Sequence, residues 1–113
     1  MRTAIMHLIE RVAAQDVTII NTGTTAHFHF QVPGYLKGIR YLLNNNTNNV
    51  TTVITVLDDE SSTLYTSAAL NENTTGYLKP DIALYNADHR LVITSADPGV
   101  STNIANITLL IER

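Results

Sequence analysis

Short runs of alternating apolar and polar residues recur along most of this chain, separated by turns rich in Gly, Pro, Asn and Asp. The clearest run places Ala26, Phe28, Phe30 and Val32 on one side and His27, His29 and Gln31 on the other. Successive side chains of a β-strand point to opposite faces, so this period of two marks a strand with one buried face. Many short strands separated by turn signals predict an all-β sandwich.

The same pattern predicts eight or nine strands, of which the last has Ile107, Leu109 and Ile111 facing inward. After the first 14 residues, we expect them at residues 16–21, 26–32, 38–43, 50–57, 64–70, 81–86, 91–95 and 104–112. Two packed sheets bury such strands economically, because a single open sheet would leave an apolar face in water. We therefore predict an all-β fold: a single-domain antiparallel β-sandwich, jelly-roll-like, that covers residues 1–113.

The first 14 residues allow two interpretations. Ala4, Ile5, Leu8, Ile9 and Val12 have helical spacing, whereas Ile5, His7 and Ile9 alternate as in a strand. We favour a strand or an extended N-terminal arm, because the rest of the chain has the pattern of a β-protein. An arm of this kind can add a strand to the sheet of a partner.

Charged residues make up only 15% of the 113 residues, and Thr, Asn and Ser supply 32 polar residues in their place. A charged fraction of about 25% is usual for soluble domains. Thr suits the exposed face of a strand and Asn suits a turn, so this composition is typical of a surface made mostly of sheet. Charge is also depleted where a protein surface meets another protein.

Several classes of function lack support in the composition. The seven Lys and Arg residues are scattered and the net charge is −3, so we expect no direct binding of nucleic acid. No apolar stretch is long enough to span a membrane, and residues 1–14 are too polar for the core of a signal peptide. Cysteine is absent, which favours synthesis in a reducing compartment.

Candidate sites for small ligands are few. His27 and His29 share one strand face, as two imidazole ligands of a metal ion would, but a polar outward face opposite the Phe residues explains them equally well. The acidic run Asp58–Glu60 lacks the spacing of a dedicated calcium loop and has the length of a hairpin turn. We expect no metal and no cofactor.

No arrangement of acids, histidine and serine has the spacing of a catalytic constellation, so we do not expect an enzyme. Tyrosines are the only residues that indicate sugar binding, since sugars stack on exposed aromatic rings. Tyr35, Tyr65, Tyr77 and Tyr85 are candidates, whereas Tyr41 alternates with Ile39 and Leu43 and is expected in the core.

The segment from Pro33 to Leu70 combines a Pro-Gly entry, the strand Val50–Leu57, the turn Asp58–Ser62 and a Leu-Tyr-Thr return at residues 64–66. With the terminal strand pair, it resembles small β-sandwich decoration (cement) proteins on the capsids of tailed bacteriophages. The resemblance implies a virion structural protein, made in the host cytoplasm, that binds the outer capsid surface and stabilises it. The implied partners are the major capsid protein and one or two further copies, as a homo-dimer or homo-trimer.

Residues for such contacts are expected in the N-terminal segment and in two Asn-rich loops. They are Ile5, Leu8, Ile9, Asn45, Asn46, Asn48 and Asn73. Two alternatives stay open, a carbohydrate-binding β-sandwich module and a structural component of a phage tail or fibre.

Overall fold

The computed structural model describes residues 9–19, 23–99 and 103–112, and these form nine strands. Sheet A contains β1 (Ile9–Ile19), β9 (Asn103–Glu112), β3 (Tyr35–Leu43) and β6 (Thr75–Leu78), in this order, and β7 (Ile82–Ala83) also pairs with β3. Sheet B contains β2 (Thr25–Phe30), β8 (His89–Ser95), β4 (Thr52–Leu57) and β5 (Thr63–Thr66). The described residues form no helix that could cross a lipid bilayer.

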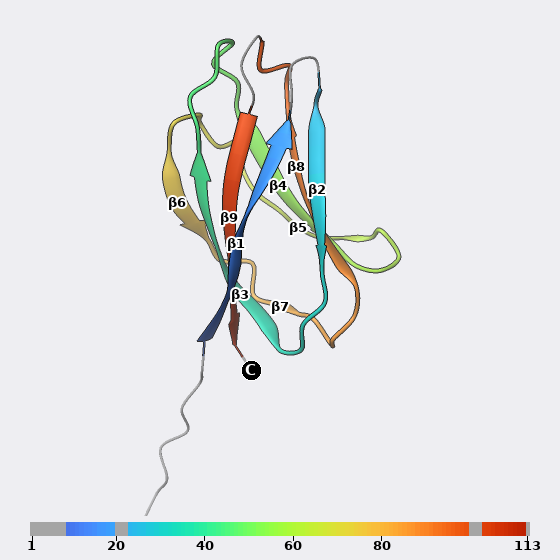
Figure 1. Cartoon of the computed structure of the whole chain (residues 1–113). Coiled ribbons are helices and arrows are strands. Elements are labelled where there is room, and N and C mark those ends of the chain that lie inside the picture. The colour runs from blue at the N-terminus through green and yellow to red at the C-terminus, as the bar shows by residue number, and fades with distance from the viewer. Residues whose placement is uncertain (1–8, 20–22, 100–102, 113) are drawn as a thin grey trace, which may run out of the picture.

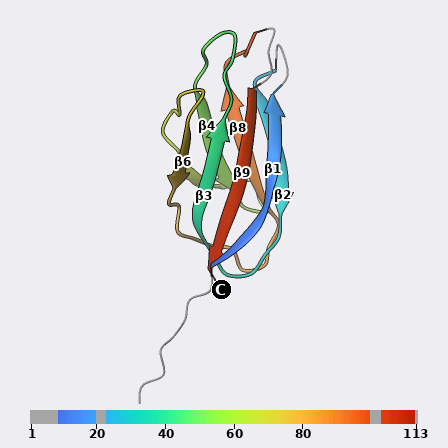
Figure 2. The ribbon, with the colours of Figure 1, turned by 60° about the vertical axis from the view of Figure 1, so that its left-hand side comes forward.

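All strand pairs are antiparallel, and the two sheets face each other (Figures 1 and 2). The chain changes sheet at most of its connections, so β1 pairs with β9 and β2 pairs with β8, from opposite ends of the sequence. The β4–β5 hairpin is a pair of consecutive strands. This strand order is that of a jelly roll, and it confirms the all-β antiparallel sandwich.

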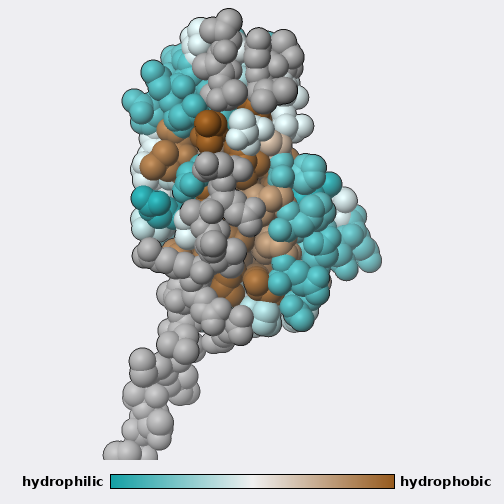
Figure 3. Space-filling model, viewed as in Figure 1, coloured by the Kyte–Doolittle hydropathy of each residue, from teal (hydrophilic) through white to brown (hydrophobic). Residues whose placement is uncertain are grey.

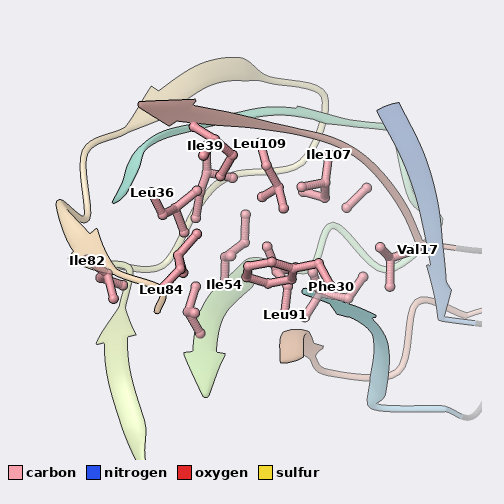
Figure 4. Packing of buried hydrophobic residues seen from close by; sticks show 14 of the residues in the cluster. Val17, Phe30, Leu36, Ile39, Ile54, Ile82, Leu84, Leu91, Ile107 and Leu109 are labelled. Carbon is pink, nitrogen blue, oxygen red and sulfur yellow. The ribbon is translucent and has the colours of Figure 1, made fainter. Parts of the chain in front are cut away.

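The core lies between the two sheets. From sheet A, Ile39, Ile107 and Leu109 point toward Ile54 and Leu91 of sheet B (Figure 4). Leu36, Ile39, Ile54, Leu84, Leu91 and Ile93 are fully buried. The predicted inward positions Phe30, Ile107, Leu109 and Ile111 are confirmed as buried, and Phe28 and Tyr41 are partly buried against this cluster.

The boundaries of several elements differ from the sequence prediction. A break was expected before residue 16, but β1 runs unbroken from Ile9 to Ile19, with a register shift between Val12 and Gln15. A bulge inserts an extra residue without ending the strand, so the polar residues near it do not mark a turn. Residues 1–8, which include Ile5 and Leu8, lie outside the described part of the chain.

The segment after the β4–β5 hairpin was interpreted wrongly. Residues 71–76 were predicted to be a loop, yet Thr75–Leu78 forms β6 at the edge of sheet A. The strand expected at 81–86 shortens to two residues, because Tyr85 and Asn86 both adopt a left-handed backbone conformation and form a turn. His89, expected in that turn, begins β8 and is buried against Phe30.

Candidate functional site

No pocket opens in the described part of the chain, and no three His, Cys, Asp or Glu residues gather there as metal ligands would. The features available for function are therefore exposed ones. Four of them stand out: the outer face of sheet A, a group of loops at one end of the sandwich, a tight turn at the other end, and a histidine pair on sheet B.

The outer face of sheet A is defined by register. Arg40 of β3 lies between Thr108 of β9 and Tyr77 of β6, and the next outward row is Asn106, Leu42 and Thr75. Ile104 and Leu110 share this face through the alternation of β9. We call these eight residues the sheet-A face. Arg40 is the one charged residue among them, while Glu112 continues the same row of β9, and Arg11 and Asp16 of β1 pair with Leu110 and Asn106 at its border.

Two large side chains are well exposed on the sheet-A face. Leu42 is 43% exposed and Tyr77 is 57% exposed. Apolar surface is visible over β3 and β9 on this side of the molecule, although grey atoms cover part of the view (Figure 3). Exposed apolar and aromatic side chains on a surface with little charge are typical of the centre of a protein–protein interface.

The Asn-rich loops meet at one end of the sandwich. The main-chain N–H of Asn73 donates to the carbonyl of Asn44 at 3.0 Å, and the side chain of Asn48 donates to the carbonyl of Asp97 at 3.0 Å. The main-chain N–H of Asn46 donates to the carboxylate of Glu72. The structure thus brings together the loops that follow β3, β5 and β8.

These loops do not expose all of the predicted contact residues. Asn45, Asn48 and Asn73 are exposed, whereas Asn46 is only 8% exposed. Asn46 is therefore not available as a surface contact. Among the four predicted Asn contact residues, only Asn45, Asn48 and Asn73 are exposed. Asn49 and Asn73 have positive φ angles, which Asn tolerates better than most residues, so part of the Asn content serves loop geometry.

Tyr85 occupies the turn at the opposite end. Tyr85 and Asn86 have φ angles of 52° and 53°, and the N–H of Ala87 donates to the carbonyl of Leu84 at 3.0 Å. This is the geometry of a type I′ turn, which favours Asn and Gly. Tyr85 is 86% exposed, so a large aromatic ring is held in an unfavourable conformation with almost no packing in return.

The histidine pair lies on the outer face of sheet B. His27 and His29 are alternate, exposed residues of β2, and their ring centroids are 5.5 Å apart. Nδ1 of His29 is 3.2 Å from a carboxylate oxygen of Asp88. The predicted placement of both rings on one strand face, opposite Phe28 and Phe30, is confirmed.

One carboxylate of the acidic turn is engaged with the main chain. Oδ1 of Asp58 accepts hydrogen bonds from the main-chain N–H groups of Glu60 at 2.9 Å and Ser62 at 2.8 Å. This carboxylate therefore holds the β4–β5 turn in place, as Asp commonly does in hairpins.

Among the residues that the structure describes, Lys37 and Tyr65 have altered acidity. A hydrogen bond to Asp81, 2.8 Å from Nζ, raises the pKa of Lys37. Burial raises the pKa of Tyr65, with a further contribution from Tyr41. Tyr65 packs against the core, so it is not an exposed platform for a sugar.

Comparison with known proteins shows the fold alone. No family model matches this chain. No curated protein matches it either. Among solved structures, a carbohydrate-binding module described as "CBM4" matches with a TM-score of 0.53 and 12% identity, over 88% of this chain and 84% of the other. The mitogen of Yersinia pseudotuberculosis matches with a TM-score of 0.51 and 10% identity, over 94% and 87% of the two chains.

Longer chains contain a similar unit. The VP2 protein of an infectious bursal disease virus subviral particle matches with a TM-score of 0.51 and 12% identity, over 94% of this chain and 32% of VP2. The isomalto-dextranase of Arthrobacter globiformis matches with a TM-score of 0.50 and 22% identity, over 75% of this chain, which spans only 16% of that enzyme. Jelly-roll units with this shape thus occur in viral capsid proteins, in carbohydrate-binding modules and within enzymes.

Proposed function

We propose that this chain is a structural protein of a virion, a capsid decoration protein that binds the outer surface of a bacteriophage head. The observation that carries the proposal is the sheet-A face, a group of eight outward residues among which only Arg40 is charged and Leu42 and Tyr77 are well exposed. Such a surface suits docking against another protein, because few charges have to be desolvated on contact.

The rest of the proposal concerns location and partners. The protein is made in the host cytoplasm and acts on the outer capsid surface, with the major capsid protein as its partner. It binds as a homo-dimer or homo-trimer, and the segment with Ile5, Leu8 and Ile9 serves as a contact between copies or with the shell. The exposed residues Asn45, Asn48 and Asn73 supply polar contacts beside the main interface.

Co-sedimentation with empty capsid shells of the encoding virus tests the proposal. We expect the purified chain to bind shells without any small ligand, and Leu42→Asp to weaken binding by about tenfold or more. The substitution places a carboxylate at the centre of the sheet-A face, where contact would desolvate it.

Thr94→Asp is the matched control, because Thr94 is an exposed strand residue of β8, in the other sheet. It adds the same charge away from the proposed contact and should leave shell binding unchanged. A chain that does not sediment with shells would refute the decoration role. Equal effects of the two aspartates would refute the assignment of the contact to the sheet-A face.

Carbohydrate binding is the second candidate, and exposed tyrosines favour it. Tyr35 is 50% exposed, and the register places it beside Glu112 at one end of the outer face that also carries Tyr77. A sugar ring that stacks on Tyr77 would stabilise the folded state, so a glycan panel should raise the melting temperature. Carbohydrate binding would be favoured over decoration if a glycan raises the melting temperature, Tyr77→Ala abolishes that increase, and the protein does not bind capsid shells.

A further inference from the structure

His27 and His29, the two outward-facing histidines of β2, are arranged as two ligands of one metal ion could be. β2 is an edge strand of sheet B, and the inward positions of this strand are held by Ala26, Phe28 and Phe30. Packing of those side chains fixes the strand and leaves His27 and His29 in solvent on the same face. The two rings meet edge to face, with an angle of 82° between their planes.

The separation of the two rings is slightly larger than one shared ion requires. Imidazole nitrogen lies about 2.0–2.1 Å from a bound zinc ion, so the centroids of two rings on one ion are about 4.5–5.2 Å apart for ligand angles from square to tetrahedral. The observed centroid separation is 5.5 Å. Small side-chain rotations on the exposed face of β2 close this difference.

Asp88 orients one of the two rings. Its carboxylate oxygens lie 3.2 and 3.3 Å from Nδ1 of His29, so a proton on Nδ1 is donated to Asp88 and the lone pair of Nε2 faces outward. Histidines that bind metals commonly donate their second N–H to a carboxylate in this way. Asp88 is a positioning residue here, not a ligand.

The surrounding charges set the affinity. The register places Arg90 of β8 opposite His29, and its positive charge opposes a cation, while Asp88 offsets that charge. The described residues provide no third side chain for the ion, since no three ligand residues gather there. Two imidazoles therefore give a weak, exchangeable site, with water at the remaining positions.

We propose that His27 and His29 chelate one divalent transition-metal ion of the class that imidazole prefers, namely Zn²⁺, Ni²⁺ or Cu²⁺. The hard ions Ca²⁺ and Mg²⁺ require oxygen ligands and should not bind here. His89 takes no part, because it is buried, stacks on Phe30 and places Nδ1 2.8 Å from the carbonyl of Ala87. This inference is independent of the proposed function.

Calorimetric titration of the 113-residue chain with ZnSO₄ and NiCl₂ at neutral pH tests the site. NMR of the imidazole groups is the second readout. We expect one ion per chain and perturbed resonances from His27 and His29. His27→Gln and His29→Gln should each weaken binding by about tenfold or more, because one ligand of a two-ligand chelate is lost. Asp88→Asn should cause a smaller loss, of about threefold or more.

His7→Gln is the control, since it removes one imidazole from the chain and leaves the sequence of β2 unchanged. It should leave the affinity unchanged, and MgCl₂ should give no heat of binding. Circular dichroism of each variant checks that the fold is intact. Absence of saturable binding, or binding that survives both single substitutions on β2, would overturn the proposal, as would a loss that follows His7 instead.

Discussion

The hydroxyl of Ser67 supplements main-chain pairing just beyond β5, where the N–H of Ser67 donates to the carbonyl of Ile54 at 2.9 Å. Its Oγ accepts a hydrogen bond from the N–H of Ile54 at 2.9 Å and donates to the carbonyl of Ala68 at 2.8 Å, and the residue is buried. Ser67→Ala leaves the N–H of Ile54 without its partner inside the protein. We expect a loss of about 1–3 kcal/mol in the free energy of unfolding, measured with urea.

The neighbouring Thr66→Ala is the control for that experiment, because Thr66 is exposed and β5 continues to pair through the main chain. It should change the stability by about 0.5 kcal/mol or less. Similar losses for the two variants would mean that the Ser67 hydroxyl does not carry the contact.

Tyr85 should lower the free energy of unfolding compared with a residue that suits its turn position. Its left-handed conformation disfavours a bulky residue and suits Asn, and an 86% exposed ring gains little from packing. Tyr85→Asn should therefore raise the free energy of unfolding by about 0.5–1 kcal/mol. A decrease on thermal or urea unfolding would show that the ring makes stabilising contacts in the free protein.

Strand alternation correctly predicted which side chains are buried and which are exposed. It could not predict the residues that adopt a left-handed backbone conformation. The period of two predicted the burial of Phe30 and Leu109 and the exposure of His27 and His29. It gave no warning of Tyr85, because Tyr is not a residue that signals a left-handed turn. His29 and Asp88 are 59 positions apart, and only the β2–β8 pairing brings them together.

The pairing of β3 with β6 depends on a glycine. Gly76 lies opposite Tyr41, and a Cβ atom added there would lie 2.5 Å from Oη and 2.8 Å from Cζ of that ring. Tyr41 is partly buried against the core and cannot retreat freely. Gly76→Ala should lower the free energy of unfolding by about 1–3 kcal/mol.

Gly38→Ala is the matched variant on β3. An added Cβ would approach the methyl end of Leu110 at 3.0 Å, and this flexible side chain is only partly buried on the outer face. We expect a smaller loss than for Gly76→Ala in the same denaturation assay. The reverse order would mean that the ring of Tyr41 yields more easily than its burial implies.

The two faces of β9 should respond differently to truncation. Leu109 is fully buried between the sheets, so Leu109→Ala should cost about 2–5 kcal/mol. Leu110 is the partly exposed neighbour of Leu109 on the outer face. Leu110→Ala should lower the free energy of unfolding by only about 1 kcal/mol. Chemical denaturation measures both, and equal losses would contradict the inward assignment of Leu109.

The sequence predicted the type of most elements, but it predicted neither every strand nor their order in the sheets. Alternation indicates which side chains of β9 are buried, yet nothing local shows that β9 lies between β1 and β3. The predicted β4–β5 hairpin was found because its two strands adjoin in sequence. β6 was missed because Asn71, Asn73 and Gly76 are residues typical of loops, and pairing with β3 overrides that preference.

We expect the chain to associate with one or two further copies of itself. We expect light scattering of the purified chain to give two or three times the protomer mass of 12.4 kDa. Removal of residues 2–8 should reduce this mass if the segment with Ile5 and Leu8 serves as a contact. A monomer at all concentrations would refute the expected dimer or trimer and leave shell binding as a separate question.

No single sequence motif marks the sheet-A face. The sheet-A face combines alternate residues of three strands, which become one surface only after β3, β6 and β9 pair: Arg40, Leu42, Thr75, Tyr77, Ile104, Asn106, Thr108 and Leu110. The low charge of the whole sequence indicated a protein-contact surface, but its location depends on the strand order of the jelly roll.

An electron cryo-microscopy map of capsid shells saturated with the chain would show directly whether it decorates their outer surface. We expect density for a nine-stranded sandwich on the outer surface of the shell, with Leu42 and Tyr77 against the capsid protein or against a second copy. Shells without added external density, or a sandwich that contacts them through the His27–His29 face with the sheet-A face in solvent, would contradict this expectation.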